Sequence, residues 1–385
     1  MTTTSAMANE YPEATLASRL VRLGTTDEGN EEEALRLPAE ILEEAGFECS
    51  FDAYDPDRPD RRSLIARLNK SDDRPSLYFG GHIDTVPYGD GAWEQYPLSG
   101  AVRDGLLYGR GSCDMKGGVA ALVCACAGMA PKLGKRDLIL HIYGGEERGC
   151  LGSLHATKRP EVFGNAGAGI IAEPTDLVAQ VGHKGALWLE VETHGRAAHA
   201  SMPEKGDNAL LRLLSVADKL RGFRPDASHP WLGSGTFALT TLHAGKNCNS
   251  IPDKAMLTVD MRTVPGQDHA ALFEYFQKLA GDGAQVRKTY DGLPVWTDPS
   301  STWCARARAR AGSISGRSTD ISCARFFTDA ASVKRLLPDL PLLILGPGQP
   351  ENAHVRDETC PVEQIVTARR IYEALIEDWY FPEDR

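Results

Sequence analysis

The sequence of 385 residues lacks the segments that mark a secreted or membrane-spanning chain. Residues 1–11 contain no basic stretch followed by an apolar run, which a signal peptide requires, and no later apolar run is long enough to cross a bilayer. Internal repeats and low-complexity tracts are also missing. We therefore expect a packed, cytoplasmic protein that does not bind membranes.

The nine cysteines do not show the spacing of a metal site or a disulfide framework. Cys124 and Cys126 are separated by one residue, and no second pair follows at zinc-finger distance, which argues against a cysteine-based structural zinc site. Their number is odd, and they fall in apolar or mixed stretches, as Cys323 does. We expect them to be reduced and to serve packing.

Two ligand classes also lack their usual signals. The formal net charge of -11 is spread over segments of mixed sign, so we expect no nucleic acid partner. The glycine-rich stretch of residues 109–118 matches neither the dinucleotide-binding fingerprint nor the phosphate loop of nucleotide hydrolases. This argues against a dinucleotide-dependent oxidoreductase.

What the sequence does contain is the pattern of an α/β protein with two domains. The length exceeds what one hydrophobic core comfortably fills, and the fractions of hydrophobic residues (42%) and charged residues (25%) are those of a globular chain. Short apolar runs alternate with helical stretches, which predicts a helix-covered, mostly parallel mixed sheet. The predicted strands are Ser76–Gly81, Leu138–Gly144, Gly169–Ala172 and Leu342–Gly346, and the predicted helices are Glu31–Phe47, Gly117–Lys132 and Val362–Trp379.

The pattern changes near His183, where residues 186–194 alternate apolar and polar side chains as a half-buried strand does. Two helices and three further strands follow before the first pattern resumes near Leu342. We therefore predict a discontinuous catalytic domain of residues 1–183 and 296–385, with an inserted α+β domain of residues 184–295. The predicted elements of the insert are the helices Asn208–Arg221 and Asp268–Gly281 and the strands Ala186–His194, Thr236–His243, Lys254–Thr263 and Ala284–Tyr290.

Polar side chains follow each predicted strand of the outer domain. His82 and Asp84 come directly after the first strand, at the edge where open α/β sheets bind ligands. Alone, this pair is weak evidence, because a turn with a solvated pair explains it more often than a metal site does. Asp114 opens a helix after a glycine-rich bend and alone could be a helix cap.

Further carboxylates and a second histidine strengthen the case that these residues belong to a metal site. Glu146 and Glu147 follow a buried strand, where each is costly to bury without a nearby cation, and Glu173 follows the next strand. His354 lies beyond the last strand. Two histidines and three carboxylates form a ligand set for two divalent metal ions, for which zinc fits best, and Glu146 remains as a general base.

Taken in order, four motifs resemble the acetylornithine deacetylase, succinyl-diaminopimelate desuccinylase and aminoacylase family of metallopeptidases. They are His82-x-Asp84-Thr85-Val86-Pro87, Gly111-x-x-Asp114-Met115-Lys116-Gly117-Gly118, Glu146-Glu147 and Asn352-Ala353-His354. The resemblance covers nearly the whole chain.

The resemblance implies a role for each residue of the centre. His82 and Glu173 hold one metal ion, Glu147 and His354 hold the other, and Asp114 bridges the two next to a cis peptide bond to Met115. It further implies that cobalt or manganese could substitute for zinc. Asp84 is expected to hydrogen-bond His82 and fix its tautomer.

For the insert, the resemblance implies a ferredoxin-like dimerisation or lid domain, and hence a homodimer. His199 is expected to reach the site of the partner subunit and polarise the scissile carbonyl. Asn249 and Arg262 are expected to bind the carboxylate of the substrate, although Arg262 could equally be an exposed strand arginine.

These features together predict a metal-dependent hydrolase that cleaves an N-acyl amino acid, of the acetylornithine deacetylase or desuccinylase type. His183-Lys184-Gly185 stands where the desuccinylase pattern has an arginine-rich turn, which leaves the acyl group open. A dipeptidase or carboxypeptidase with the same metal chemistry is the closest alternative. A protein that binds an amino-acid derivative without catalysis is disfavoured because all five ligands and Glu146 are present.

Overall fold

The computed structural model describes residues 11–68 and 74–382 and divides into two compact units. The outer unit contains the chain up to Gly182, Trp296–Ala324 and the residues from Thr328 onward. The inserted unit contains His183–Val295 and Arg325–Phe327. The stretch before Tyr11, in which the sequence shows no signal peptide, lies outside the described residues.

The outer unit is built on a six-stranded sheet in the order β1-β2-β6-β3-β7-β18. The four strands β6, β3, β7 and β18 are parallel, β2 is antiparallel to β6, and β1 is antiparallel to β2. The prediction of a mostly parallel mixed sheet is therefore confirmed. The strands are β1 (Glu48–Ala53), β2 (Arg62–Leu68), β3 (Ser76–His82), β6 (Leu138–Tyr143), β7 (Ala166–Ile171) and β18 (Leu342–Ile344).

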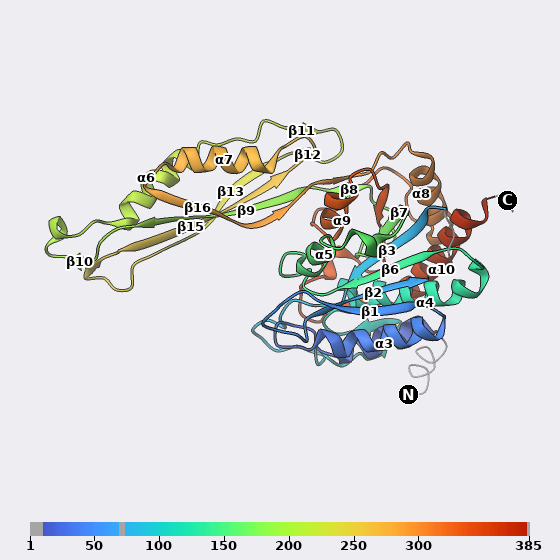
Figure 1. The fold of residues 1–385 in the computed structure, drawn as a ribbon. Coiled ribbons are helices and arrows are strands. Elements are labelled where there is room, and N and C mark those ends of the chain that lie inside the picture. Colours follow the sequence, from blue (N-terminus) through green and yellow to red (C-terminus); the bar gives the residue numbers. More distant parts are fainter. Residues whose placement is uncertain (1–10, 69–73, 383–385) are drawn as a thin grey trace. The chain divides into compact units, whose positions relative to one another are not determined.

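Helices cover both faces of this sheet (Figure 1). The apolar helix α4 packs against β3 and β6 and is flanked by α2, α3 and α10, whereas α5 and α9 pack together on the other side. Every residue of β3 and β6 is buried, as expected for strands covered on both faces. The helices are α2 (Pro12–Arg22), α3 (Glu31–Glu44), α4 (Gly117–Leu133), α5 (Leu151–Ala156), α8 (Thr302–Ser315), α9 (Ala330–Leu336) and α10 (Val362–Tyr380).

One helical stretch among the described residues, Ser112–Leu133, is long and apolar enough to cross a membrane. It includes α4, whose side chains lie in the main hydrophobic core. Its apolar character is that of a central helix of a packed domain. A small three-stranded sheet of β4 (Val102–Arg103), β5 (Leu106–Tyr108) and β19 (Thr359–Pro361) completes the outer unit.

The inserted unit is a four-stranded antiparallel sheet in the order β13-β15-β9-β16, with α6 and α7 on one face. In chain order the elements run β-α-β-β-α-β, which is the ferredoxin-like arrangement. Its own core includes Leu189, Leu213, Leu257 and Phe276. The elements are β9 (Gly185–His194), α6 (Ala209–Leu220), β13 (Thr236–Ala244), β15 (Lys254–Thr263), α7 (His269–Ala280) and β16 (Ala284–Gly292).

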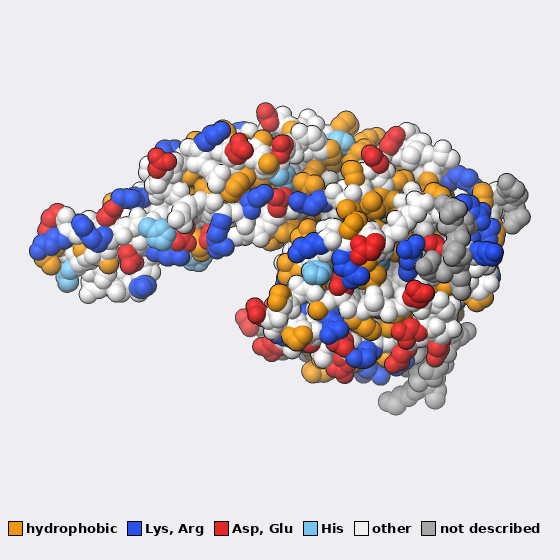
Figure 2. All heavy atoms as spheres, viewed as in Figure 1, with side chains coloured by type: hydrophobic (Ala, Val, Ile, Leu, Met, Phe, Trp, Pro, Cys, Tyr) orange, Lys and Arg blue, Asp and Glu red, His pale blue; other side chains and the backbone are white. Residues whose placement is uncertain are grey.

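The short segment Arg325–Phe327 belongs to the inserted unit, although the sequence analysis assigned it to the outer domain. The reason is aromatic packing, because the ring of Phe327 lies 4.8 Å from that of Tyr290 and 5.9 Å from that of Trp188. On the face shown in Figure 2, acidic and basic side chains are interspersed on both units.

Candidate metal centre

The candidate residues of the outer unit lie where its strands end. β3 ends at His82, β6 leads into Glu146 and Glu147, and β7 is followed after one residue by Glu173. Because these strands are parallel neighbours, their carboxyl ends meet at one edge of the sheet. His82, Glu146 and Glu173 are at most 5% exposed, so the edge holds an unusual concentration of buried charge.

The turn after β6 depends on two glycines. A Cβ at Gly144 would lie 2.2 Å from a carboxylate oxygen of Glu31, and one at Gly145 would lie 2.8 Å from the hydroxyl of Tyr54. Gly145 also has a φ of 71°, which disfavours other residues. The glycines therefore allow the chain to turn closely and place both glutamates at the sheet edge.

Asp114 lies between the two histidines. Its Oδ1 is 3.2 Å from Nε2 of His82, and its Oδ2 is 3.2 Å from Nε2 of His354. The Nε2 of His354 is also 3.0 Å from Oε1 of Glu147. The peptide bond from Asp114 to Met115 is cis, as the resemblance implied. Asp114 thus presents one carboxylate oxygen to each histidine.

Glu173 and Asp84 complete the surroundings of His82. Oε2 of Glu173 is 3.8 Å from Nε2 of His82. On the other side of the ring, Nδ1 lies 3.0 Å from the backbone oxygen of Asp84 and 3.6 Å from its carboxylate. The expected contact between Asp84 and His82 is therefore made through the backbone carbonyl.

The carboxylate of Asp84 has different partners. It accepts hydrogen bonds from the backbone N–H groups of Glu146 and Glu147, at 3.0 and 3.1 Å. One side chain thus holds the turn that carries both glutamates, a role that the sequence did not reveal.

The electrostatics of the site follow from burying several carboxylates together. Burial raises the pKa of Glu173 to about 8 and that of Glu146 well above its ordinary value. Burial and the neighbouring Asp114 also raise the pKa of Glu147. Hydrogen bonds to Asp114 and Glu147 raise the pKa of His354 to about 10. These shifts show carboxylates that lack sufficient positive charge nearby.

Divalent metal ions would supply that charge. His82, Asp114 and Glu147 each offer a ligand atom, and these atoms lie within 4.8 Å of one another. Imidazole nitrogens and carboxylate oxygens are the donors that zinc and related metals accept. The residues present therefore fit a metal centre, and the cluster has more carboxylates than its two histidines could neutralise.

Sequence reasoning missed a further buried carboxylate, Asp329, just before α9. It is fully buried, and burial raises its pKa to about 7, while the charge of His82 opposes this increase. Its charge contributes to the raised pKa of Glu146. In the sequence it resembles an ordinary residue at a helix start, so only the fold brings it to the site.

In the inserted unit, His199 and Asn249 lie on adjoining exposed segments. His199 pairs with Ser250 across a short antiparallel ladder, and the N–H of Ala200 donates to the backbone oxygen of Asn249 at 2.9 Å. The backbone N–H of Ser201 donates to Nδ1 of His199 at 3.1 Å. Because Nδ1 accepts this bond, the proton of the neutral ring lies on Nε2, which can donate to a substrate.

Arg262 lies on a different element, strand β15. Its guanidinium donates to both carboxylate oxygens of Asp260, at 2.8 and 3.0 Å, and lies 6.0 Å from the ring of Phe327. Asp260 therefore already occupies part of the donor capacity that was expected to bind substrate.

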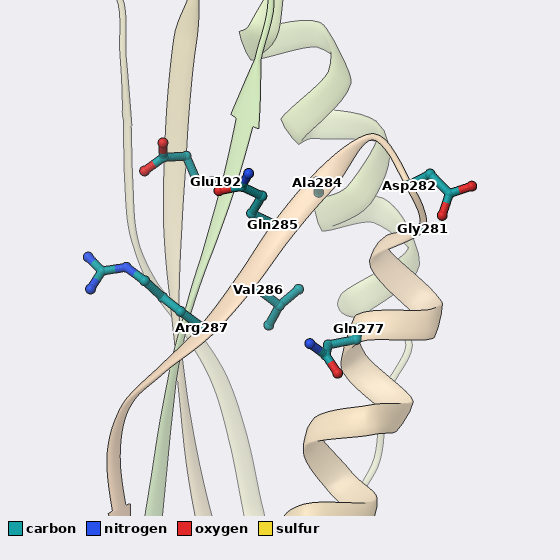
Figure 3. Close-up of a pocket in the computed structure, with 8 residues that line it drawn as sticks. All are labelled: Glu192, Gln277, Gly281, Asp282, Ala284, Gln285, Val286 and Arg287. Atoms are coloured by element: carbon teal, nitrogen blue, oxygen red, sulfur yellow. The ribbon is translucent and has the colours of Figure 1, made fainter.

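Cavities are found in both units. In the outer unit, a cavity of about 800 Å³ is lined by His354, Arg110 and Pro87 among others. The inserted unit has a cavity of about 560 Å³ at the turn between α7 and β16, lined by Gln277, Gln285 and Arg287 among others (Figure 3). None of the residues lining the second cavity is a candidate site residue, and we assign it no role.

Comparison with known proteins identifies the family of this chain. The model of peptidase family M20/M25/M40 matches residues 78–378. A succinyl-diaminopimelate desuccinylase of Gluconacetobacter diazotrophicus is 29% identical over 95% of this chain and 96% of its own length. One of Granulibacter bethesdensis is 30% identical over 80% of this chain and 84% of its own length.

Solved structures share the fold. An M20 family metallo-carboxypeptidase of Sulfolobus solfataricus superposes with a TM-score of 0.81 at 18% identity, covering 96% of this chain and 99% of that one. A dipeptidase of Saccharomyces cerevisiae gives a TM-score of 0.74 at 15% identity, covering 98% and 97%. The chain therefore belongs to peptidase family M20/M25/M40 and is a metal-dependent hydrolase of amide bonds.

Proposed function

We propose that this protein hydrolyses the amide bond of an N-acyl-L-amino acid and releases a carboxylate and the free amino acid. The observation that carries the proposal is Asp114, whose two oxygens each face a different histidine, together with Glu146, which is buried in the turn that also carries Glu147. The similarity to desuccinylases over nearly the whole chain supports a small acylated substrate.

We assign two divalent metal ions to the centre, most simply zinc, with cobalt or manganese as substitutes. His82 and Glu173 would hold one ion, Glu147 and His354 the other, and Asp114 both. When bound, the ions would polarise the amide carbonyl and lower the pKa of a water molecule.

The chain's own residues perform the proton transfers. Glu146 accepts a proton from the attacking water, whose oxygen bonds to the carbonyl carbon, and later gives it to the nitrogen as the C–N bond breaks. Nε2–H of His199 donates to the carbonyl oxygen as negative charge develops there. Asn249 and Arg262 bind the substrate carboxylate.

We further propose that the protein is a cytoplasmic homodimer in which His199 serves the partner subunit. The exposed apolar side chains of Leu211 (63% exposed) and Leu214 (46%) on α6 favour a covered surface on the inserted unit. Nine free cysteines favour a reducing compartment. Sedimentation equilibrium tests the dimer, and a strictly monomeric, active enzyme would contradict it.

The test of function is hydrolysis of a panel of N-acetylornithine, N-succinyl-diaminopimelate, other N-acetyl amino acids and dipeptides. Wild-type, metal-stripped and zinc-restored protein are compared. We expect cleavage of an acylated amino acid that is lost on stripping and regained with zinc. Preferred cleavage of dipeptides would establish the peptidase alternative instead.

A further inference from the structure

Arg110 and Glu358 form a buried ion pair. It contacts the loops that carry the proposed metal ligands His82, Asp114 and His354. Glu358 follows His354 by four residues and is 1% exposed. Its Oε1 accepts hydrogen bonds from the backbone N–H groups of Cys113 and Asp114, at 2.9 and 3.0 Å. Glu358 therefore fixes the backbone of the residue that faces both histidines.

Arg110 joins this carboxylate to the other two loops. Its Nη1 donates to Oε2 of Glu358 at 2.7 Å and to the backbone oxygen of Val355, next to His354, at 3.0 Å. Its Nη2 donates to the backbone oxygen of Pro87 at 3.2 Å, in the loop that follows His82 and Asp84. The guanidinium also lies 5.1 Å from the ring of Trp93 and is held on that side.

We propose that Arg110 and Glu358 are positioning residues that set the metal affinity of the centre. The proposal rests on the proposed function. Ligand atoms must be held within about half an ångström for tight binding, and residues that support ligands contribute to affinity without touching the metal. The planar fork of arginine suits this task because it donates at fixed angles to three acceptors in two loops, Val355 and Glu358 in one and Pro87 in the other.

The pair differs from an ordinary stabilising ion pair in what it touches. Arg67 and Asp137 form a pair of similar length, 2.8 Å against 2.7 Å for Arg110 and Glu358, in which Asp137 is also buried. That pair joins the carboxyl end of β2 to the residue before β6, at the end of β6 opposite to Glu146. Asp137→Asn is therefore a matched control that breaks a partly buried ion pair without disturbing a ligand loop.

The experiment compares full-length wild type with Glu358→Gln, Arg110→Lys, Arg110→Met and Asp137→Asn. Zinc affinity is measured by calorimetry against a competing chelator, and stability is followed in parallel by denaturant unfolding. We expect Glu358→Gln to weaken zinc binding about tenfold to hundredfold. Arg110→Lys should bind zinc less tightly than the wild type but more tightly than Arg110→Met. Asp137→Asn should lower the unfolding midpoint and leave zinc affinity unchanged.

Folded Glu358→Gln or Arg110→Met with wild-type zinc affinity would overturn the inference and leave the proposed function standing. An equal loss of affinity in Asp137→Asn would also overturn it, because the effect would then be one of general stability. A wild-type protein that binds no divalent metal would overturn the proposed function as well. If Glu358→Gln does not fold, Arg110→Lys, which keeps the buried charge, decides the question.

Discussion

The outer and inserted units carry their candidate residues in different ways. In the outer unit His82, Glu146 and Glu173 are buried at a sheet edge and contact one another or their neighbours within the same unit. In the inserted unit His199 and Asn249 are exposed on short segments with mainly local backbone partners. The first arrangement is a buried cluster held together by contacts among its own residues, whereas the second leaves its side chains open to solvent.

Substitution of Glu146 tests the outer unit and should have the largest effect. Glu146→Gln keeps the size of the side chain but cannot accept a proton, so we expect kcat to fall about 10²- to 10⁴-fold. Zinc content and the unfolding midpoint serve as controls and should stay near wild-type values. Activity that survives in Glu146→Gln would move the role of base to another group, with Asp329 the next candidate.

His199→Ala tests the inserted unit and should reduce kcat about 10²- to 10³-fold, because a donor to the developing oxyanion is lost. Co-expression of His199→Ala with Glu146→Ala subunits distinguishes the two possible arrangements. If His199 acts on the partner subunit, mixed dimers regain one intact site, and about a quarter of all sites become active. No recovery in mixed dimers would place His199 with the site of its own subunit.

A smaller effect is expected when the residues proposed to bind the substrate carboxylate are substituted. Asn249→Ala should raise KM about tenfold with little change in kcat, because it removes binding energy that substrate and transition state share. Arg262→Lys should raise KM less, since Asp260 already shares the guanidinium. Steady-state kinetics on the preferred substrate measure both values. A larger effect of Arg262→Lys would show that its bond to Asp260 is exchanged for one to substrate.

The mildest test concerns stability. His141, in β6, is buried between the hydroxyl of Tyr143 and the backbone oxygen of Val162, and burial lowers its pKa from 6.5 to about 3. In the unfolded chain His141 binds a proton near pH 6.5, whereas in the folded chain it stays neutral at that pH. The free energy of unfolding should therefore fall as the pH drops from about 6.5 to 3, by at most about 1.4 kcal/mol per pH unit from this residue.

Denaturant unfolding of His141→Gln across this range should show a correspondingly shallower pH dependence. The slope of the wild-type protein over the same pH range is the reference. An unchanged slope in His141→Gln would assign acid sensitivity to other buried groups.

Much of the fold could be predicted because buried strands and helices leave periodic traces. β15 was predicted with the bounds that it has, and β3 and β6 differ from the prediction by one residue. The first helix, β1 and β2 were not predicted. Of these, β1 alternates exposed and half-buried residues and so lacks a strong apolar run.

The part of the site that could be predicted consists of the residues that directly follow the predicted strands. His82, Glu147 and Glu173 follow apolar runs directly, so their meeting at one edge follows from parallel pairing. Asp329 and Glu358 carry no such signal, because their importance lies in contacts across long stretches of chain. Glu358 meets Asp114 over 244 residues, and no local pattern encodes that distance.

The carboxylate of Asp84 supports two residues that have different proposed roles. By accepting the N–H groups of both Glu146 and Glu147, it makes the proposed base and a proposed metal ligand parts of one rigid unit, which also includes His82 through the backbone of Asp84. The placement of Glu146 relative to Glu147 thus depends on a single side chain. Substitution of Asp84 would therefore misplace the proposed base and the proposed metal ligand together, so the position of one cannot be changed there without the other.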